Sequence, residues 1–131
     1  MISTHILDTH LGKPAINVLI KILDSQDNIV AESRTNEDGR VADFNLSGIK
    51  TGDYSLVFYT AEYFDRLALA TFFPKVVIHF SVLDIAQHYH IPLLISPFAY
   101  SRRCLPLFLM GNLYNEINTI CCAFNFRLHH F

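Results

Sequence analysis

The chain has 131 residues, of which 51% are hydrophobic and 17% charged, so it holds the material for one domain with a sizeable core. Its formal net charge is −2 at pH 7 and its ten Lys and Arg residues are scattered, which argues against a nucleic-acid partner because phosphate binding needs a concentrated basic face. No stretch approaches the roughly 18 apolar residues needed to cross a bilayer, so no membrane partner is expected either.

Cysteine usage indicates the compartment. The first residues lack the basic stretch and apolar run of a secretory signal peptide. The three cysteines are an odd number, and all lie near the C-terminal end, at Cys104, Cys121 and Cys122. This is not the arrangement of a disulfide framework and suits a reducing compartment better, so we expect a cytoplasmic protein.

The first hundred or so residues contain short segments with the alternation typical of β-strands. In each segment every second residue is aliphatic or aromatic, so these side chains share one face. A similar segment opens the chain, with Ser3, His5 and Leu7 on one face. The other alternating segments are 17–23, 54–60, 76–82 and 89–95.

Turn-forming residues separate these segments. Gly and Pro within 11–14 close the first segment, and the stretch 48–53 precedes the segment 54–60. The sequence Asn36-Glu37-Asp38-Gly39 has the composition of a hairpin turn, because Asp and Gly tolerate positive φ. We therefore expect a hairpin that reverses the chain there.

One stretch follows a helical period instead. Thr60 has the side chain of an N-cap, and the apolar residues after it recur at helical spacing. These residues are Tyr63, Phe64, Leu67 and Ala68. Many short strands with regular turns and one short helix indicate an all-β sandwich.

The character of the chain changes after residue 101. Glu116 is the only charged residue between Leu105 and Phe126, and neither the strand period nor the helical period is sustained. Ordering a residue costs about 1–2 kcal/mol in backbone entropy, which the few large side chains of this stretch would not offset by burial. The sequence thus predicts a domain over 1–101 and an apolar, poorly ordered extension over 102–131.

Three of the seven histidines occupy suggestive positions. His5 lies on a strand face, and His88 and His90 are two residues apart, so their side chains point the same way. Pro92, on that same face, cannot donate a ladder hydrogen bond and marks an edge or an irregular point. Imidazole titrates near pH ~6.5, which suits it to proton transfer, although a single histidine is more often structural or solvated.

Arg40 follows the Asp38-Gly39 turn directly and would project from the start of a strand. On residue type alone, an ordinary exposed arginine is the simpler interpretation. Together with two histidines, a guanidinium would complete a site for hydrolysing a planar anionic heterocycle. One imidazole would activate water, the other would orient it or protonate the leaving nitrogen, and the guanidinium would hold the oxyanion.

Other chemistries compete with this interpretation. His88 and His90 form a His-x-His pair, a common source of two zinc ligands from one strand, and His5 would be a third ligand. No Cys-x-x-Cys accompanies the pair. A Ser-His-Asp hydrolase is less favoured because the chain has no Gly-x-Ser-x-Gly elbow, and it has no glycine-rich phosphate loop.

Several longer motifs follow one another along the chain. They are Ser3-Thr4-His5-Ile6-Leu7-Asp8, Gly12-Lys13-Pro14-Ala15, Asp38-Gly39-Arg40, Thr60-Ala61-Glu62-Tyr63-Phe64, Phe72-Phe73-Pro74, His88-Tyr89-His90-Ile91-Pro92-Leu93-Leu94-Ile95-Ser96-Pro97-Phe98 and Tyr100-Ser101. Each is weak alone, but together they resemble the 5-hydroxyisourate hydrolases of the transthyretin-like family, collinearly from residue 2 to about 101.

The resemblance implies a transthyretin-like sandwich of two four-stranded sheets, assembled as a homotetramer that is a dimer of dimers. It implies hydrolysis of 5-hydroxyisourate to 2-oxo-4-hydroxy-4-carboxy-5-ureidoimidazoline in urate degradation, without a metal or an organic cofactor. The family's catalytic residues carry over onto His5, Arg40 and His90. Its substrate-binding residues carry over onto His5, Arg40 and His88.

The resemblance ends at Ser101. The family continues with Thr-Tyr-Arg-Gly-Ser, and the last four of these residues help to form its active site. This chain instead has Arg102, Arg103, Cys104, Leu105 and Pro106. An alternative function is therefore that of a catalytically impaired transthyretin-like binding or scaffold protein.

Overall fold

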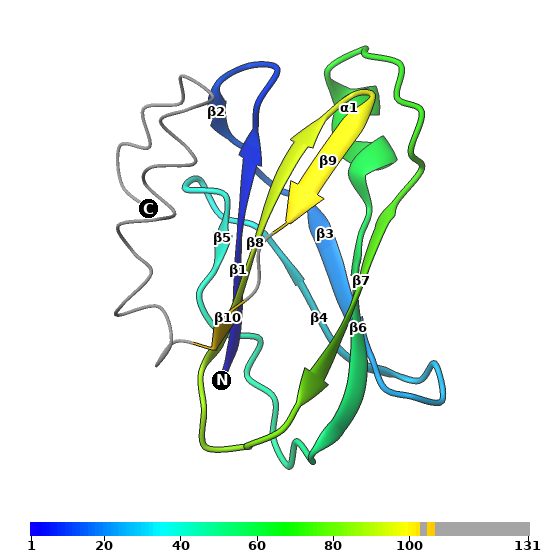
Figure 1. The fold of residues 1–131 in the computed structure, drawn as a ribbon. Coiled ribbons are helices and arrows are strands. Elements are labelled where there is room, and N and C mark those ends of the chain that lie inside the picture. Colours follow the sequence, from blue (N-terminus) through cyan, green and yellow to red (C-terminus); the bar gives the residue numbers. More distant parts are fainter. Residues whose placement is uncertain (103–104, 107–131) are drawn as a thin grey trace.

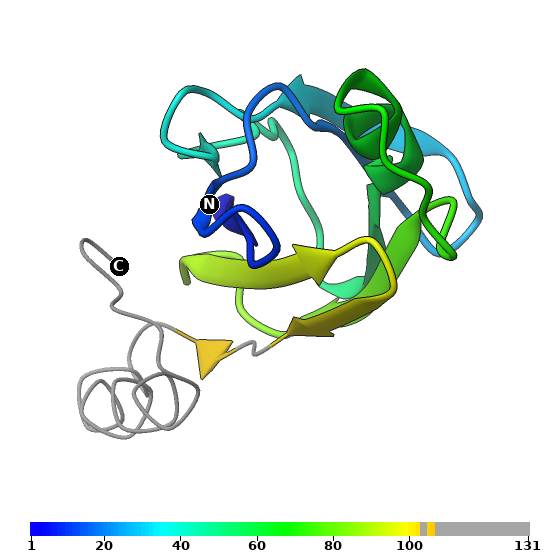
Figure 2. The ribbon, with the colours of Figure 1, turned by 90° about the horizontal axis from the view of Figure 1, so that it is seen from above.

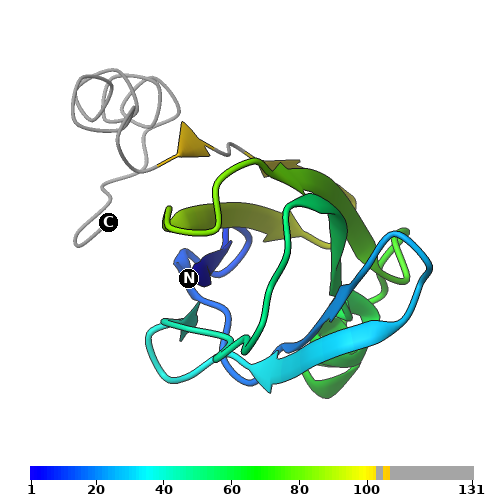
Figure 3. The same ribbon diagram turned by 90° about the horizontal axis from the view of Figure 1, so that it is seen from below.

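The computed structural model describes residues 1–102 and 105–106, so most of the extension expected over 102–131 lies outside the described residues. Two β-sheets lie face to face, with one short helix at an end of the sandwich (Figure 1). Seen from either end, the sheets are two layers around a common interior (Figures 2 and 3). The expected all-β sandwich with one short helix is confirmed.

The first sheet is built around two parallel neighbours, β1 (Ile2–Asp8) and β8 (Tyr89–Ser96), which pair from Ile2↔Tyr89 to Asp8↔Ile95. Along its other edge, each of these two strands pairs with two short strands, one after the other. These are β2 (Lys13–Pro14) and β5 (Arg40–Val41) beside β1, and β9 (Ala99–Arg102) and β10 (Leu105–Pro106) beside β8. The sheet therefore has six strands but is four strands wide.

The second sheet is antiparallel, with the order β4-β3-β6-β7. Its strands are β3 (Leu19–Leu23), β4 (Ile29–Arg34), β6 (Gly52–Phe58) and β7 (Val76–Val82). β7 coincides with the predicted segment, and β3, β6 and β8 begin and end within two residues of their predicted bounds.

The interior between the sheets is apolar because inward side chains alternate along each strand. In β8 every second residue from Tyr89 to Ile95 is buried, and in β3 the same alternation buries Ile20 and Ile22. Burying one such side chain stabilises the fold by about 1.5–3 kcal/mol. The alternation also determines the opposite face, so His90 lies on the outside of the first sheet.

The helix α1 (Thr60–Arg66) connects β6 and β7 and buries Tyr63 and Phe64. The Tyr63 hydroxyl donates a 2.6 Å hydrogen bond to Oδ2 of Asp8, which is fully buried at the end of β1. Burial and this hydrogen bond raise the pKa of Tyr63 well above its usual range. The hydrogen bond thereby joins the helix to the first sheet.

Within the described residues no helix is long and apolar enough to cross a membrane.

The ends of α1 differ from the prediction. Tyr59 is the N-cap, and Thr60 is the first helical residue, with its hydroxyl donating to the Phe73 carbonyl oxygen at 3.4 Å. The Thr60 side chain therefore bonds to the loop that follows the helix and does not cap the helix. Leu67 is the C-cap, and Ala68 has φ +54°, a left-handed conformation that ends the helix before these two residues can join it.

The turn at 36–39 does not form the expected hairpin. It follows β4, in the second sheet, but leads into β5, in the first sheet, so the chain crosses from one sheet to the other. The reason is that β5 finds its partner on β1 and not on β4. Local composition predicted the turn correctly, but the strand that pairs with the residues after it is distant in sequence.

The turn is held by its own side chain and by β1. Asn36 Oδ1 accepts hydrogen bonds from the main-chain N–H groups of Asp38 and Arg40 at 2.9 and 3.0 Å. The Gly39 carbonyl oxygen accepts from the N–H of Ile6 at 2.8 Å, which draws the turn onto β1. Gly39 has φ +71°, and a Cβ there would lie only 2.5 Å from the Ile6 carbonyl oxygen.

Gly39→Ala should therefore destabilise the protein by about 3 kcal/mol, because the left-handed backbone and the clash with β1 both oppose a side chain. Gly12→Ala is the matched control: Gly12 has φ +68°, but nothing lies within 4 Å of its Cβ position, so the loss should be about 1 kcal/mol. Denaturant unfolding measures both. Equal losses would show that the approach of Gly39 to Ile6 is not a constraint.

Candidate active site

The residues expected to form the site lie on the outer face of the first sheet. Residues paired across neighbouring strands carry their side chains on the same face. Ser3 is paired with His90 of β8, and His5 is paired with Arg40 of β5. Because Ser3 and His5 are two residues apart on β1, all four side chains lie on one face. His88, two residues before His90, joins them there through Ser3.

Ser3 connects the two histidines at the start of the motif 88–98. Its Oγ lies 2.6 Å from Nε2 of His88 and 2.8 Å from Nδ1 of His90, both at hydrogen-bond distance. Ser3 is 4% exposed, and the two imidazole ring centres are 6.4 Å apart. Ser3 is not among the site residues predicted from the sequence. The available signal was that Ser3 shares a strand face with His5.

Known proteins carry the same framework. The model of the HIUase/transthyretin family matches residues 2–103. This chain belongs to that family.

The relatives of this family member include hydrolases. It is 37% identical to the 5-hydroxyisourate hydrolase of Salmonella typhimurium over 105 residues, 77% of each chain. It is 38% identical to the probable 5-hydroxyisourate hydrolase of Schizosaccharomyces pombe, over 76% of this chain and 86% of the other.

Solved structures agree with the fold of the family. The 5-hydroxyisourate hydrolase of Klebsiella pneumoniae superposes with a TM-score of 0.72 and 33% identity, over 79% of this chain and 97% of the other. Sea bream transthyretin in complex with thyroxine superposes with a TM-score of 0.74, over 80% and 94%. At 23% identity, this second likeness concerns the fold alone.

His5 of this HIUase/transthyretin family member is held in its neutral form. Burial lowers its pKa to about 4, and the positive charge of Arg40 acts in the same direction, followed by His90. A hydrogen bond with the Asp38 main chain and the charge of the Asp38 side chain oppose this shift only in part. At neutral pH the ring is therefore unprotonated and able to accept a proton.

His90 is in a similar state. Burial lowers its pKa to about 4, with further contributions from His88 and Arg40. The pKa of His88 is also lowered, first by burial and then by the N-terminal ammonium group, while Asp43 opposes the shift. Because Arg40 depresses the pKa of both His5 and His90, the guanidinium lies within electrostatic range of the two imidazoles.

The geometry around His88 and His90 differs from that of a metal centre. In residues 1–102 and 105–106, no group of three or more His, Cys, Asp or Glu side chains is arranged to hold a metal ion. The Ser3 hydroxyl is bonded to one nitrogen of each of these rings. The zinc alternative therefore gains no support from this part of the chain.

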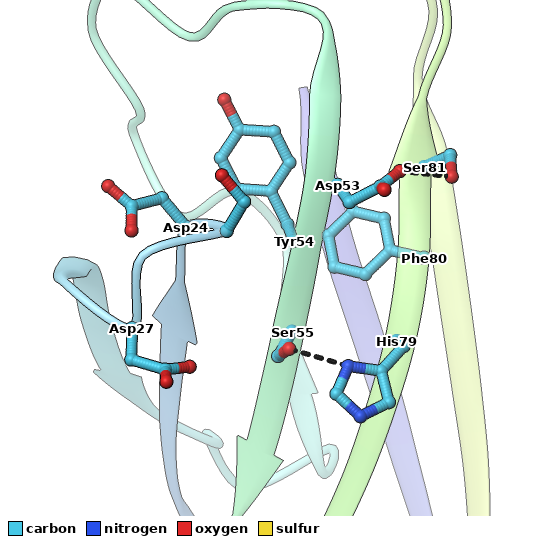
Figure 4. A pocket seen from close by; sticks show the side chains of 9 residues that line it. Asp24, Asp27, Asp53, Tyr54, Ser55, His79, Phe80 and Ser81 are labelled. Atoms are coloured by element: carbon cyan, nitrogen blue, oxygen red, sulfur yellow. Dashed lines mark hydrogen bonds between the residues drawn. The ribbon is translucent and has the colours of Figure 1, made fainter.

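A separate cleft of about 460 Å³ lies on the second sheet (Figure 4), and none of the residues above lines it. It is lined in part by three acidic side chains, Asp24, Asp27 and Asp53. Within it, Ser55 Oγ lies 2.8 Å from Nδ1 of His79, in a contact exposed to solvent. This pair reproduces the Ser3–His90 contact in atom types and distance but stands outside the site, so it provides controls for the experiments below.

Burial of neutral histidines makes stability depend on pH. The unfolded chain binds protons at His5 near pH ~6.5, whereas the folded protein does so near pH 4, so the unfolded state binds more protons between these values. The contribution of His5 to the free energy of unfolding should be constant above pH ~7 and fall as the pH is lowered, by about 2 kcal/mol at pH 5. Chemical denaturation at pH 7.5, 6 and 5 measures it. His5→Gln should reduce the slope, and a wild-type profile without slope would contradict the buried neutral ring.

Proposed function

We propose that this chain hydrolyses 5-hydroxyisourate to 2-oxo-4-hydroxy-4-carboxy-5-ureidoimidazoline in urate degradation. The observation that carries the proposal is the grouping of His5, Arg40 and His90 on one sheet face, with the histidines neutral at pH 7. The named activity of the relatives agrees with it. These three are the proposed catalytic residues, and His5, Arg40 and His88 are the proposed substrate-binding residues.

The chemistry is a ring-opening hydrolysis. His90 takes a proton from water as the oxygen forms its bond to the ring carbonyl carbon, and Arg40 stabilises the oxyanion that results. His5 orients the water and the substrate. When the carbon–nitrogen bond breaks, the leaving nitrogen receives the proton from the imidazolium. This sequence calls on no metal or organic cofactor.

The test is to add the purified protein to urate that is being oxidised in situ and to follow the decay of the intermediate. The protein should accelerate the decay, and His90→Ala or His5→Ala should each reduce kcat/KM by about 10²–10⁴, the usual effect of a positioned acid or base. Ser55→Ala, which removes the hydroxyl bonded to His79 on the second sheet, should leave the rate unchanged. Full activity in both His90→Ala and His5→Ala would show that these two histidines are not catalytic.

One observation favours the second candidate, a catalytically impaired binding or scaffold protein. In β10, Leu105 is paired with His90 and Pro106 with Tyr89. These positions correspond to the Gly and Ser of the family's terminal motif. The strand beside His90, β10, therefore lies in the segment where this chain differs from the terminal motif of the hydrolases.

We further propose a cytoplasmic homotetramer built as a dimer of dimers. β7 is a free edge of the second sheet within the described residues, and its Val77 is 38% exposed. An unpaired edge presents a row of main-chain donors and acceptors, so pairing with a second copy satisfies them. The active sites would then lie where the outer faces of the first sheets meet.

Replacement of residues 102–131 by Thr-Tyr-Arg-Gly-Ser should separate these possibilities. The replacement should raise hydrolysis and solubility if the native tail impairs the site, because it restores polar groups beside His90. Turnover, urate-analogue binding and mass by light scattering at micromolar concentration should be measured on both proteins. Binding without turnover in both would support the scaffold function, and a strictly monomeric species in both would contradict the tetramer.

A further inference from the structure

We propose that Ser3 is a positioning residue that selects the reactive tautomer of His90 and couples it to His88. The inference rests on the proposed function, since it assigns Ser3 a role in the chemistry of His90. It concerns a hydroxyl that has no part in the hydrolysis described above.

The position of Ser3 is determined by the sheet. β1 and β8 are parallel neighbours, and Ser3 is the direct partner of His90 in their register. Its Oγ contacts Nδ1 of His90 at 2.8 Å and Nε2 of His88 at 2.6 Å. At 4% exposure the hydroxyl has little access to water, so these two nitrogens are its partners. The Nδ1 contact leaves Nε2 as the nitrogen of His90 that is available for the reaction.

The two contacts depend on each other because a serine hydroxyl has one hydrogen. If it donates to His88 Nε2, it must accept from His90, which then carries its proton on Nδ1 and leaves Nε2 bare as a base. If it donates to His90 Nδ1, then His90 carries its proton on Nε2 and His88 must donate. Accepting from both rings would leave the buried hydroxyl hydrogen without an acceptor, which is unfavourable. The orientation of one hydroxyl thus sets the tautomers of both rings together.

Only the first orientation suits the proposed reaction. With Nε2 bare, His90 takes the proton of the attacking water, and its Nδ1–H continues to donate to Ser3 while the ring is charged. The same Nε2 then returns the proton to the leaving nitrogen, so the hydroxyl need not rotate during the cycle. This orientation requires His88 to be neutral and to accept at Nε2. The lowered pKa of His88 is consistent with that requirement.

Variants at Ser3 test the role in the purified full-length protein. Ser3→Ala should lower kcat by about 10- to 100-fold with a smaller change in KM, because the ring stays in place but its tautomer is no longer selected. Ser3→Thr keeps a hydroxyl on a strand-compatible side chain and should retain most of the activity. Ser55→Ala removes the equivalent contact with His79 Nδ1 on the second sheet (Figure 4) and should change nothing.

A second measurement does not depend on turnover. In ¹⁵N-histidine-labelled protein, the nitrogen chemical shifts should show His90 protonated at Nδ1 in the wild type and in Ser3→Thr. In Ser3→Ala the signals should move toward the Nε2-protonated form. An unchanged tautomer of His90 in Ser3→Ala would overturn the proposal. So would a loss of kcat that is the same in Ser3→Ala and Ser3→Thr, together with the same drop in melting temperature in both. If the wild type shows no hydrolysis but its tautomer shifts in Ser3→Ala, the proposed function fails and the positioning role stands.

Discussion

The parallel pairing of β1 with β8 is the constraint on which the rest of the structure depends. It places Ser3 beside His90, and the same strand carries His5 to its pairing with Arg40 on β5. On the inward face of the sheet, the same two strands contribute Ile6 and much of the apolar interior. A single ladder of main-chain hydrogen bonds therefore supports the core on one face and assembles the chemical groups on the other.

The site combines burial with the positive charge of Arg40, and both act on the protonation equilibria of His5 and His90. Burial disfavours the protonated imidazole, and Arg40 does so again through like-charge repulsion. The result is a pair of weak bases beside a guanidinium cation. A site of this kind favours developing negative charge on a substrate, because a cation is already in place before the reaction begins.

Period-two alternation predicted the strands well because it reports burial on one face, a property that the sequence carries locally. β7 was predicted to the residue for this reason. Contacts between distant segments are a different matter. Neither the crossing at Asn36 nor the partnership of Ser3 with His90 follows from spacing, since each depends on which strands become neighbours. The grouping of His5, Arg40 and His90 could be expected only from the resemblance of several motifs together.

The separation of β1 from β8 along the chain also bears on how the protein reaches its folded state. The Thr4 hydroxyl donates to a carbonyl 87 residues away, and the whole ladder has comparable separations. Contacts of such range slow folding, because loop closure must precede the gain from pairing. At roughly 5–20 residues per second of synthesis, β1 waits several seconds at least before β8 exists. During that interval β1 has left the ribosome with an unpaired edge, so the segment that later bears Ser3 and His5 stays without its sheet neighbour until β8 is made.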